Sequence, residues 1–483
     1  MSEVETYCNY INGEWVTAVQ TFENRNPADT AELVGRFARG GAQEMANAAE
    51  AAQCAFPAWS GLAGPARGAF LFKAAEILDS RFEQLALEMT REEGKTLPES
   101  RGEVRRAINI FRYFAGEGSR LPGHLVPSER DRVFMFSVRK PIGVVGLVTP
   151  WNFPSAIPAW KLAPALICGN TVVLKPASAA PLSAWRLVEA LAEAGAPKGV
   201  VNFIAGPGGE LGEALVDAPP VKAISFTGSC GVGAWLHERA SRRRLRIQLE
   251  MGGKNPTIVL ADADFKAAVE NTANGAFFST GQKCTATSRV IVEESIHDRF
   301  VDALVERTAR LKVGDGREPG VEIGPAIDQA QLDTDLKYIE IGKREGAKLK
   351  FGGRRLTDGS FSRGYFIEPA IFTDVEEGMT IAQEEIFGPV LAVMRARDFD
   401  HAVRIANNVA FGLSASIQTQ NVSRIFDYVQ KLEAGLLTVN LPSAGVEYQL
   451  PFGGTKESSF GPKEQGPAAL DFYSDYKTVY LKY

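Results

Sequence analysis

Apolar positions repeat with two different periods along this chain, and the change of period divides it. Between residues 40 and 120 they recur at helical spacing among Ala, Glu, Leu and Arg, as in Ala69 to Thr90 and Pro98 to Gly116. An apolar stripe with that period is typical of amphipathic helices. From Pro141 onward, short β-branched runs alternate with amphipathic stretches and end in Gly or Pro turns. The pattern predicts a helical opening segment followed by alternating strands and helices.

The β-branched runs form two series. The first comprises Gly143 to Val148, Thr171 to Leu174, Val200 to Ile204 and Lys222 to Phe226, with a helix expected over Ser183 to Ala194. The second comprises Asn255 to Leu260, Arg289 to Glu293, Ala370 to Thr373, Val390 to Ala396 and Leu436 to Asn440. Strands that alternate with helices indicate parallel sheets, so we expect two α/β units in tandem. The terminal run Thr478 to Tyr483 predicts a strand without a sequence neighbour, which favours pairing between subunits.

The length and net charge of the chain exclude several classes of protein. A chain of 483 residues exceeds the size of one hydrophobic core, so more than one folding unit is expected. The 53 basic and 58 acidic residues nearly balance, which argues against a nucleic-acid partner. The chain begins with the acidic run Met-Ser-Glu-Val-Glu and has no apolar stretch long enough to cross a bilayer. We therefore expect a cytoplasmic protein without a membrane anchor.

Cysteine usage points to one candidate nucleophile. The five cysteines are widely spaced, with neither a Cys-x-x-Cys pair nor a histidine cluster, so disulfides and a metal site are not expected. Cys284 differs from an inert buried cysteine because small polar residues surround it in the segment Phe278 to Arg289. An ordinary thiol is mostly protonated at neutral pH, so efficient attack needs a base, a cation or a peptide dipole nearby. Glu250 and Lys283 are the candidates.

Three other segments carry possible chemistry, each with a structural alternative. The glycines after the strand Ile224 to Ser229 could let a pyrophosphate approach the following helix, although their spacing is not Gly-x-Gly-x-x-Gly and ordinary turns would also explain them. Lys175 ends a predicted strand and could hold a ribose hydroxyl or phosphate, or could simply be solvated. Asn152 lies in the stiff segment Pro150 to Pro154 and could offer its amide to an oxyanion, or could cap a turn.

Taken together, these segments resemble the aldehyde dehydrogenase superfamily over essentially the whole chain. The matching motifs are Pro150-Trp-Asn-Phe-Pro154, Lys175-Pro176, Phe226-Thr-Gly-Ser229, Glu250-Met-Gly-Gly-Lys254, Gly281-Gln-Lys-Cys284, Glu384-Glu-Ile-Phe-Gly-Pro389 and Pro451-Phe-Gly-Gly454. The resemblance implies an α/β aldehyde dehydrogenase fold with three parts. These are a Rossmann-like cofactor domain (1–120 and 141–252), a second α/β catalytic domain (253–455) and a small β oligomerisation element (121–140 and 468–483). It also implies a homodimer or homotetramer.

The resemblance further implies residue roles. Cys284 attacks the aldehyde, the Asn152 amide and the Cys284 backbone N–H hold the alkoxide, Glu250 delivers the hydrolytic water, and Lys161 supports Asn152. NAD or NADP is implied as cofactor, with Lys175 and Glu385 on the ribose. The expected cofactor-binding residues are Thr149, Pro150, Trp151, Lys175, Ser178, Gly208, Phe226, Gly228, Ser229, Val232, Glu385 and Phe387. Members that prefer NAD tend to carry a glutamate where this chain has Ser178, so NADP is expected to be tolerated or preferred.

For the substrate, the likeness is greatest to α-ketoglutaric semialdehyde (2,5-dioxopentanoate) dehydrogenases. Succinic semialdehyde dehydrogenases are nearly as similar, but several of them carry an arginine where this chain has Trp160. The residues expected to line the substrate tunnel are Phe153, Trp160, Lys283, Thr285 and Val446, a wall that would also admit aliphatic or aromatic aldehydes. The group that binds a distal carboxylate is open, with Lys283 and Arg289 as hypotheses.

Two rival functions remain at this point. An acylating enzyme would pass the thioester to coenzyme A without a hydrolytic glutamate, and the presence of Glu250 argues against it. A catalytically silent NAD(P)-binding or structural protein would have no need of Asn152, Glu250 and Cys284 together.

Overall fold

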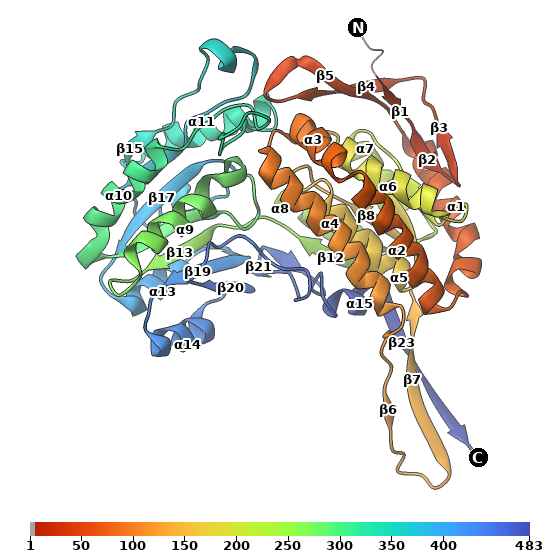
Figure 1. Ribbon diagram of the computed structural model, residues 1–483. Helices are drawn as coiled ribbons and strands as arrows, with labels where there is room; N and C mark the ends of the chain where they lie inside the picture. The colour runs from red at the N-terminus through yellow and green to blue at the C-terminus, as the bar shows by residue number, and fades with distance from the viewer. Residues whose placement is uncertain (1–4) are drawn as a thin grey trace.

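A computed structural model describes residues 5–483, and two large β-sheets dominate it (Figure 1). The helical opening segment is confirmed, with α1 (Ala42–Ser60), α2 (Gly64–Ser80), α3 (Phe82–Glu93) and α4 (Leu97–Glu117). The stretch from Ala69 to Thr90 is two helices, because Arg81 leaves the helical conformation between α2 and α3. No helix within residues 5–483 is long and apolar enough to span a membrane.

The first large sheet has eight strands in the order β22-β12-β11-β8-β9-β10-β2-β3. Its parallel centre consists of β8 (Val144–Val148), β9 (Thr171–Lys175), β10 (Val201–Phe203), β11 (Val221–Thr227) and β12 (Arg246–Glu250). The helices that follow these strands are α5 (Ala156–Ile167), α6 (Leu182–Ala194), α7 (Gly208–Asp217) and α8 (Cys230–Arg242). Antiparallel strands β2 (Asn9–Ile11), β3 (Glu14–Val16) and β22 (Ser459–Phe460) complete its edges.

Helices cover both faces of this sheet, which explains its continuous apolar strands. Val145 and Leu147 pack in one core with residues of α2, α4, α5 and α6. Val144, their neighbour on the opposite face, packs in a second core with residues of α1, α7 and α8. Because helices cover both faces, a ligand-binding site can form in the loops at the carboxyl ends of the strands.

The second large sheet has the order β15-β16-β17-β14-β13-β19-β20. Six strands are parallel: β13 (Asn255–Val259), β14 (Thr287–Glu293), β16 (Ala370–Thr373), β17 (Val390–Ala396), β19 (Ser414–Gln418) and β20 (Leu436–Val439), with β15 (Lys348–Gly352) antiparallel at the edge. Its helices are α9 (Phe265–Phe277), α10 (His297–Ala309), α11 (Gln329–Arg344), α12 (Thr380–Gln383), α13 (Phe399–Asn407) and α14 (Val422–Lys431). The prediction of two successive α/β units is confirmed.

Three smaller sheets complete the fold. One joins β1 (Thr6–Tyr7), β4 (Thr21–Asn26) and β5 (Asp29–Ala38), and another joins β18 (Phe411–Gly412) and β21 (Thr455–Lys456). Short 3-10 helices are η1 (Phe278–Gly281), η2 (Glu294–Ile296) and η3 (Gly359–Arg363).

The third small sheet, β23-β7-β6, projects from the body as an arm (Figure 1). It contains β6 (Leu125–Val126), β7 (Val133–Pro141) and the C-terminal β23 (Ser474–Lys482). The predicted terminal strand therefore begins earlier than expected and finds an antiparallel partner, β7, within its own chain. The preceding helix α15 (Ala468–Tyr473) contributes Leu470 and Phe472 to the core around α5.

Candidate active site

Two cavities meet at Cys284, where loops from both large sheets converge. The first, of about 220 Å³, is lined by Pro150, Trp151, Asn152, Thr227, Gly228, Ser229, Met251, Gly252, Cys284, Gln331, Glu385 and Phe387. The second, of about 320 Å³, is lined by Glu99, Gly102, Glu103, Arg106, Phe153, Trp160, Asn274, Phe278, Ser279, Lys283, Cys284, Thr285, Ala444, Gly445, Val446 and Phe452. A group bound in either cavity would lie against the same sulfur.

An unusual backbone presents this cysteine. The loop between α9 and β14 passes through three consecutive left-handed residues, Ser279 (φ 53°), Thr280 (φ 58°) and Gly281 (φ 68°). Left-handed conformations are costly for residues other than glycine and cluster at functional sites. A Cβ on Gly281 would lie 2.4 Å from the backbone oxygen of Gly388, so the close packing of these two loops requires glycine.

The Cys284 thiol is protonated at neutral pH in this arrangement. Burial and, to a lesser degree, the carboxylates of Glu385 and Glu250 raise its pKa to about 12, although the backbone N–H groups of Thr285 and Cys284 lower it. The peptide dipoles therefore favour the thiolate, and the attraction between Lys283 and the Cys284 thiolate, which raises the pKa of Lys283, acts in the same sense. Glu250 disfavours the thiolate by charge and can assist only by accepting a proton.

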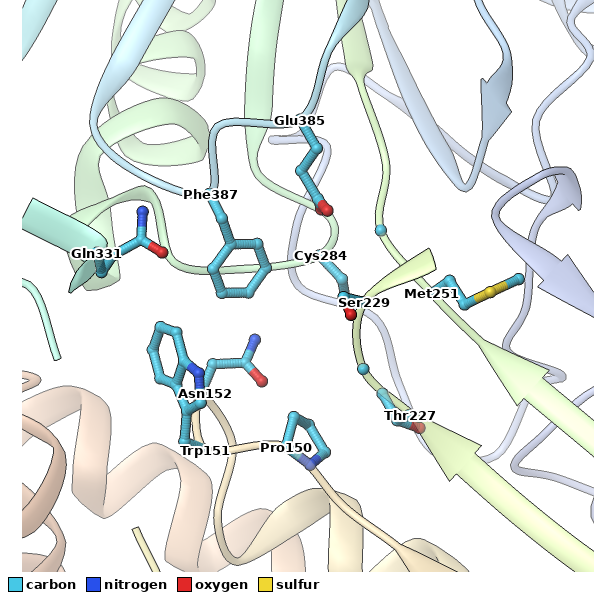
Figure 2. A pocket seen from close by; sticks show the side chains of 12 residues that line it. Pro150, Trp151, Asn152, Thr227, Ser229, Met251, Cys284, Gln331, Glu385 and Phe387 are labelled. Atoms are coloured by element: carbon cyan, nitrogen blue, oxygen red, sulfur yellow. The ribbon is translucent and has the colours of Figure 1, made fainter. Parts of the chain in front are cut away.

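Asn152 is placed for hydrogen bonding beside this sulfur. Figure 2 shows Cys284 between the loop of Trp151 and Asn152 and the loop of Glu385 and Phe387. The buried Asn152 Nδ2 donates to the backbone oxygen of Gln282 at 3.0 Å, which fixes the orientation of the amide. An amide nitrogen carries two hydrogens, so one donor is left for a ligand in the cavity.

A buried polar chain runs from Glu250 into the first sheet. Gln248 Nε2 donates to Glu250 Oε1 at 3.4 Å, Ser225 Oγ donates to Gln248 Oε1 at 2.6 Å, and Lys161 Nζ donates to Ser225 Oγ at 2.7 Å. Lys161 also forms an ion pair with Glu464. Burial, with the Glu464 charge adding to it, raises the pKa of Glu250 well above its usual value. A carboxyl with a raised pKa can exchange protons near neutral pH.

Support of Asn152 comes from a residue that the sequence analysis missed. Lys161, expected in that role, instead bonds Ser225 and Glu464. Lys95 Nζ donates to the backbone oxygen of Asn152 at 2.7 Å and forms a buried ion pair with Glu103 at 2.6 Å. Among the described residues no hydrogen bond joins Lys161 to Asn152, and a supporting role for Lys161 near the site stays a prediction.

Six of the expected cofactor residues line the first cavity: Pro150, Trp151, Gly228, Ser229, Glu385 and Phe387. Glu385 accepts from the Gly253 N–H at 3.1 Å, and burial raises its pKa to about 7. A Cβ on Gly252 would lie 2.0 Å from Glu385 Oε2, so a larger residue at this position would displace the Glu385 carboxylate. Phe387 holds a left-handed φ of 62° and packs edge-to-face on Trp151 at 5.4 Å.

The other six lie outside that lining, in or just after β8 to β11: Thr149, Lys175, Ser178, Gly208, Phe226 and Val232. Burial lowers the pKa of Lys175 to about 8, and its Nζ would lie 3.9 Å from a Cβ on Gly208. Ser178 Oγ donates to the Gly206 backbone oxygen at 2.7 Å. Phe226 is buried beneath Gly228, and Val232 is exposed in the first turn of α8.

The residues along this edge fit a phosphate-bearing nucleotide. Within residues 5–483, the buried hydroxyls of Thr149 and Thr227 have no hydrogen-bond partner. Ser229 caps α8 without using its side chain for the cap, so its hydroxyl and the first N–H groups of the helix are available. Such a helix N-terminus favours a pyrophosphate.

All five residues expected on the substrate tunnel, Phe153, Trp160, Lys283, Thr285 and Val446, line the second cavity. The sequence analysis missed its charged wall on α4, formed by Glu99, Glu103 and Arg106. Their spacing of four and three residues on a predicted helix was the available signal, because such positions share one face.

Arg289, one of two hypotheses for the anion-binding group, lies elsewhere. Its buried guanidinium donates to the backbone oxygens of Lys254, Ile405 and Ala406 at 2.8 to 3.1 Å. Those bonds hold β14 against α13, so the hypothesis for Arg289 is wrong.

Comparisons with known proteins find similarity over nearly the whole chain. The model of the aldehyde dehydrogenase family matches residues 15–479. Alpha-ketoglutaric semialdehyde dehydrogenase of Bacillus subtilis (strain 168) is 49% identical over 100% of this chain and 99% of its own length. The 2,5-dioxopentanoate dehydrogenase of Saccharolobus solfataricus is 43% identical over 94% of this chain and 95% of its own. The structure of betaine aldehyde dehydrogenase from Staphylococcus aureus in complex with NAD+ matches with a TM-score of 0.96 at 34% identity, covering 99% of this chain and 94% of that one.

Proposed function

We propose, since this chain belongs to the aldehyde dehydrogenase family, that it oxidises α-ketoglutaric semialdehyde to 2-oxoglutarate with NAD or NADP. The observation that carries the proposal is the position of Cys284 at the junction of two cavities, one suited to a nucleotide and one to a small aldehyde. The two semialdehyde relatives reported above support the substrate. Succinic semialdehyde, or a broad range of aliphatic and aromatic aldehydes, is the second candidate, because apolar side chains share the tunnel wall with charged ones.

Oxidation begins at the sulfur. The Cys284 thiol passes its proton to water in the cavity, and the thiolate adds to the aldehyde carbon. The resulting alkoxide is held by the Asn152 amide and the Cys284 backbone N–H. NAD or NADP bound in the first cavity would supply the acceptor for the hydride that leaves this carbon. The product of this half-reaction is a thioester on Cys284.

Hydrolysis then releases the acid. Glu250 takes a proton from the water that attacks the thioester, and the sulfur leaves as a thiolate. Its raised pKa suits this work, since a carboxyl in its ordinary range would be a weak base at neutral pH. Lys161 and Ser225 position the inner end of the polar chain behind Glu250. This water-dependent step is what separates the proposal from an acylating enzyme.

Cofactor binding is assigned to residues at the carboxyl edge of the first sheet and to Glu385, which lies in the loop before β17 of the second sheet. Lys175 and Glu385 would hold the ribose hydroxyls, and Ser229 with the start of α8 would hold the pyrophosphate. At Ser178 a hydroxyl takes the place of a repelling carboxylate, so in this proposal NADP is tolerated or preferred.

The domain division and the assembly are also proposals. Residues 1–120 with 141–252 would form the cofactor domain and 253–455 the catalytic domain, in agreement with the two large sheets. The arm of β6, β7 and β23 would join subunits into a homodimer or homotetramer, because β23 is an edge strand with exposed Tyr480 and Leu481. A cytoplasmic location stays a prediction.

A panel of aldehydes with and without a distal carboxylate, assayed with both cofactors while the acid product is measured, tests the function. We expect the highest kcat/KM for α-ketoglutaric semialdehyde. If no aldehyde drives cofactor reduction, the proposal is wrong and a silent nucleotide-binding protein remains.

A further inference from the structure

Arg106 has far more hydrogen-bonding capacity than the protein uses. Its guanidinium lies on the wall of the second cavity, 5.4 Å from the centre of the Trp160 ring. Within residues 5–483 its one hydrogen bond runs from Nη2 to Gln465 Oε1 at 3.3 Å, and its buried Nε has no partner. An arginine carries five N–H donors, and buried donors without partners are costly, so a guanidinium in this state favours a ligand.

The carboxylates of the same cavity are already committed elsewhere. Glu99 accepts from Thr96 and from the N–H and hydroxyl of Ser279. Glu103 forms its ion pair with Lys95 and accepts backbone N–H groups of the loop that starts α5. These bonds hold both carboxylates in place, so the Arg106 charge is left without an ion-pair partner among the described residues.

The position of Arg106 also makes up for an arginine that this chain lacks at the position of Trp160. Several succinic semialdehyde dehydrogenases carry an arginine where this chain has Trp160, which left the distal carboxylate without an anchor. Here α4 supplies a guanidinium over the face of that tryptophan. The indole is itself fixed, because its Nε1 donates to Glu464 Oε2 at 2.8 Å and its ring packs on Phe452. The Trp160 ring that lies against the Arg106 guanidinium is therefore held in a fixed orientation.

We propose that Arg106 binds the carboxylate at the far end of the aldehyde substrate and so makes this site selective for short aldehyde acids. The inference rests on the proposed function and names the residue that sets its substrate class. A carboxylate can accept two parallel N–H bonds from a guanidinium, which fixes direction as well as position. With the acid end held at Arg106, the aldehyde end of a short chain extends along the cavity toward Cys284, which lines the same cavity.

Lys283 is the competing cation on this wall. Burial lowers its pKa to about 8, and its Nζ makes one long contact of 3.4 Å to the Asn274 backbone oxygen. A group that loses its proton near neutral pH holds an anion less firmly than an arginine, which stays charged. The geometry and the charge both favour Arg106.

The test compares two substrates in Arg106→Gln: α-ketoglutaric semialdehyde and pentanal, an uncharged aldehyde of equal chain length. The kcat/KM for α-ketoglutaric semialdehyde divided by that for pentanal should be about tenfold to about a hundredfold lower than in the wild type. The change should come mainly from a higher KM for α-ketoglutaric semialdehyde, as expected for a lost charge-assisted hydrogen bond. Arg105→Gln is the matched control, because this neighbouring arginine pairs with Asp79 at 2.7 Å and lies outside the cavity lining. Its ratio should equal that of the wild type.

Direct binding separates this inference from the proposed function. Calorimetric titration with glutarate, a dicarboxylate that cannot react, should show binding to the wild type, weaker binding to Arg106→Lys and the weakest to Arg106→Gln. An unchanged substrate ratio in folded Arg106→Gln overturns the inference, as does a selective loss found only in Lys283→Gln. If the wild type oxidises pentanal and α-ketoglutaric semialdehyde equally well, the inference about Arg106 fails, but the proposal that the protein oxidises aldehydes stands. If it oxidises neither, the proposed function fails and the glutarate titration alone decides the role of Arg106.

Discussion

Replacing Asn152 by alanine isolates one hydrogen bond at the reacting centre. One Asn152 N–H is committed to the Gln282 carbonyl, so the change removes a single donor from the oxyanion. Loss of one such donor typically lowers kcat by about a hundredfold to a thousandfold, or about 2.7–4 kcal/mol of transition-state stabilisation. The variant also leaves the buried Gln282 carbonyl unpaired, at a cost of about 1–3 kcal/mol in folding stability. The rate and stability effects are measured separately.

Stopped-flow measurement of the first turnover reports the step that Asn152 serves. We expect the burst of reduced cofactor to slow by the full factor, because alkoxide formation precedes hydride transfer. Asn202→Ala is a matched control: that buried amide also donates to backbone oxygens, of Val172 and Gly199, but lies on β10 away from both cavities. It should lower the melting temperature and leave the burst rate per folded molecule unchanged. A burst at near wild-type rate in Asn152→Ala would refute the oxyanion role.

Four further outcomes follow from the same site. Cys284→Ala should abolish oxidation while cofactor binding, followed by fluorescence titration, survives; residual turnover would place the nucleophile elsewhere. Glu250→Gln should keep the burst of reduced cofactor but slow steady turnover, and normal turnover would remove Glu250 from hydrolysis. Since the base must be ionised, turnover limited by hydrolysis should fall as pH drops through the raised pKa of Glu250. Lys161→Met removes a nearby cation, so that fall should move to higher pH, and a move to lower pH would contradict the electrostatic account.

The sequence predicted strands best where the buried side chains of the strand are apolar. β16 and β17 have the bounds that their β-branched runs predicted, because both faces of these strands pack in hydrophobic cores. The fully buried β19, Ser-Ala-Ser-Ile-Gln, was missed. Its polar side chains are satisfied by backbone contacts, such as Ser416 Oγ to the Leu441 oxygen at 2.6 Å. A hydrophobic pattern cannot identify a strand whose interior positions are hydrogen-bonded instead of apolar.

The active-site residues could likewise be only partly predicted from the sequence. The loops around Asn152, Glu250 and Cys284 could be identified because each concentrates unusual residues in a few consecutive positions. Helical spacing places Arg106 on one face with Glu103, but neither Arg106 nor Lys95 could be given a role from the sequence. Their contacts form only when α4 and the turn before it pack beside those loops. Burying a charge is costly unless it is paired, and Lys95 is stabilised in this place by ion pairs with Glu103 at 2.6 Å and Glu93 at 3.8 Å.

That buried pair links the fold to the chemistry. Lys95 bonds the backbone oxygen of Asn152, and Glu103 accepts the N–H groups of Ser155 and Ala156, so one ion pair fixes both ends of the segment that carries the oxyanion donor. Arg106 lies one turn further along α4 and faces the same cavity. A single helix thus orients the Asn152 segment and, in our proposal, holds the far end of the substrate. Any shift of α4 would then change the alignment of aldehyde and oxyanion donor together.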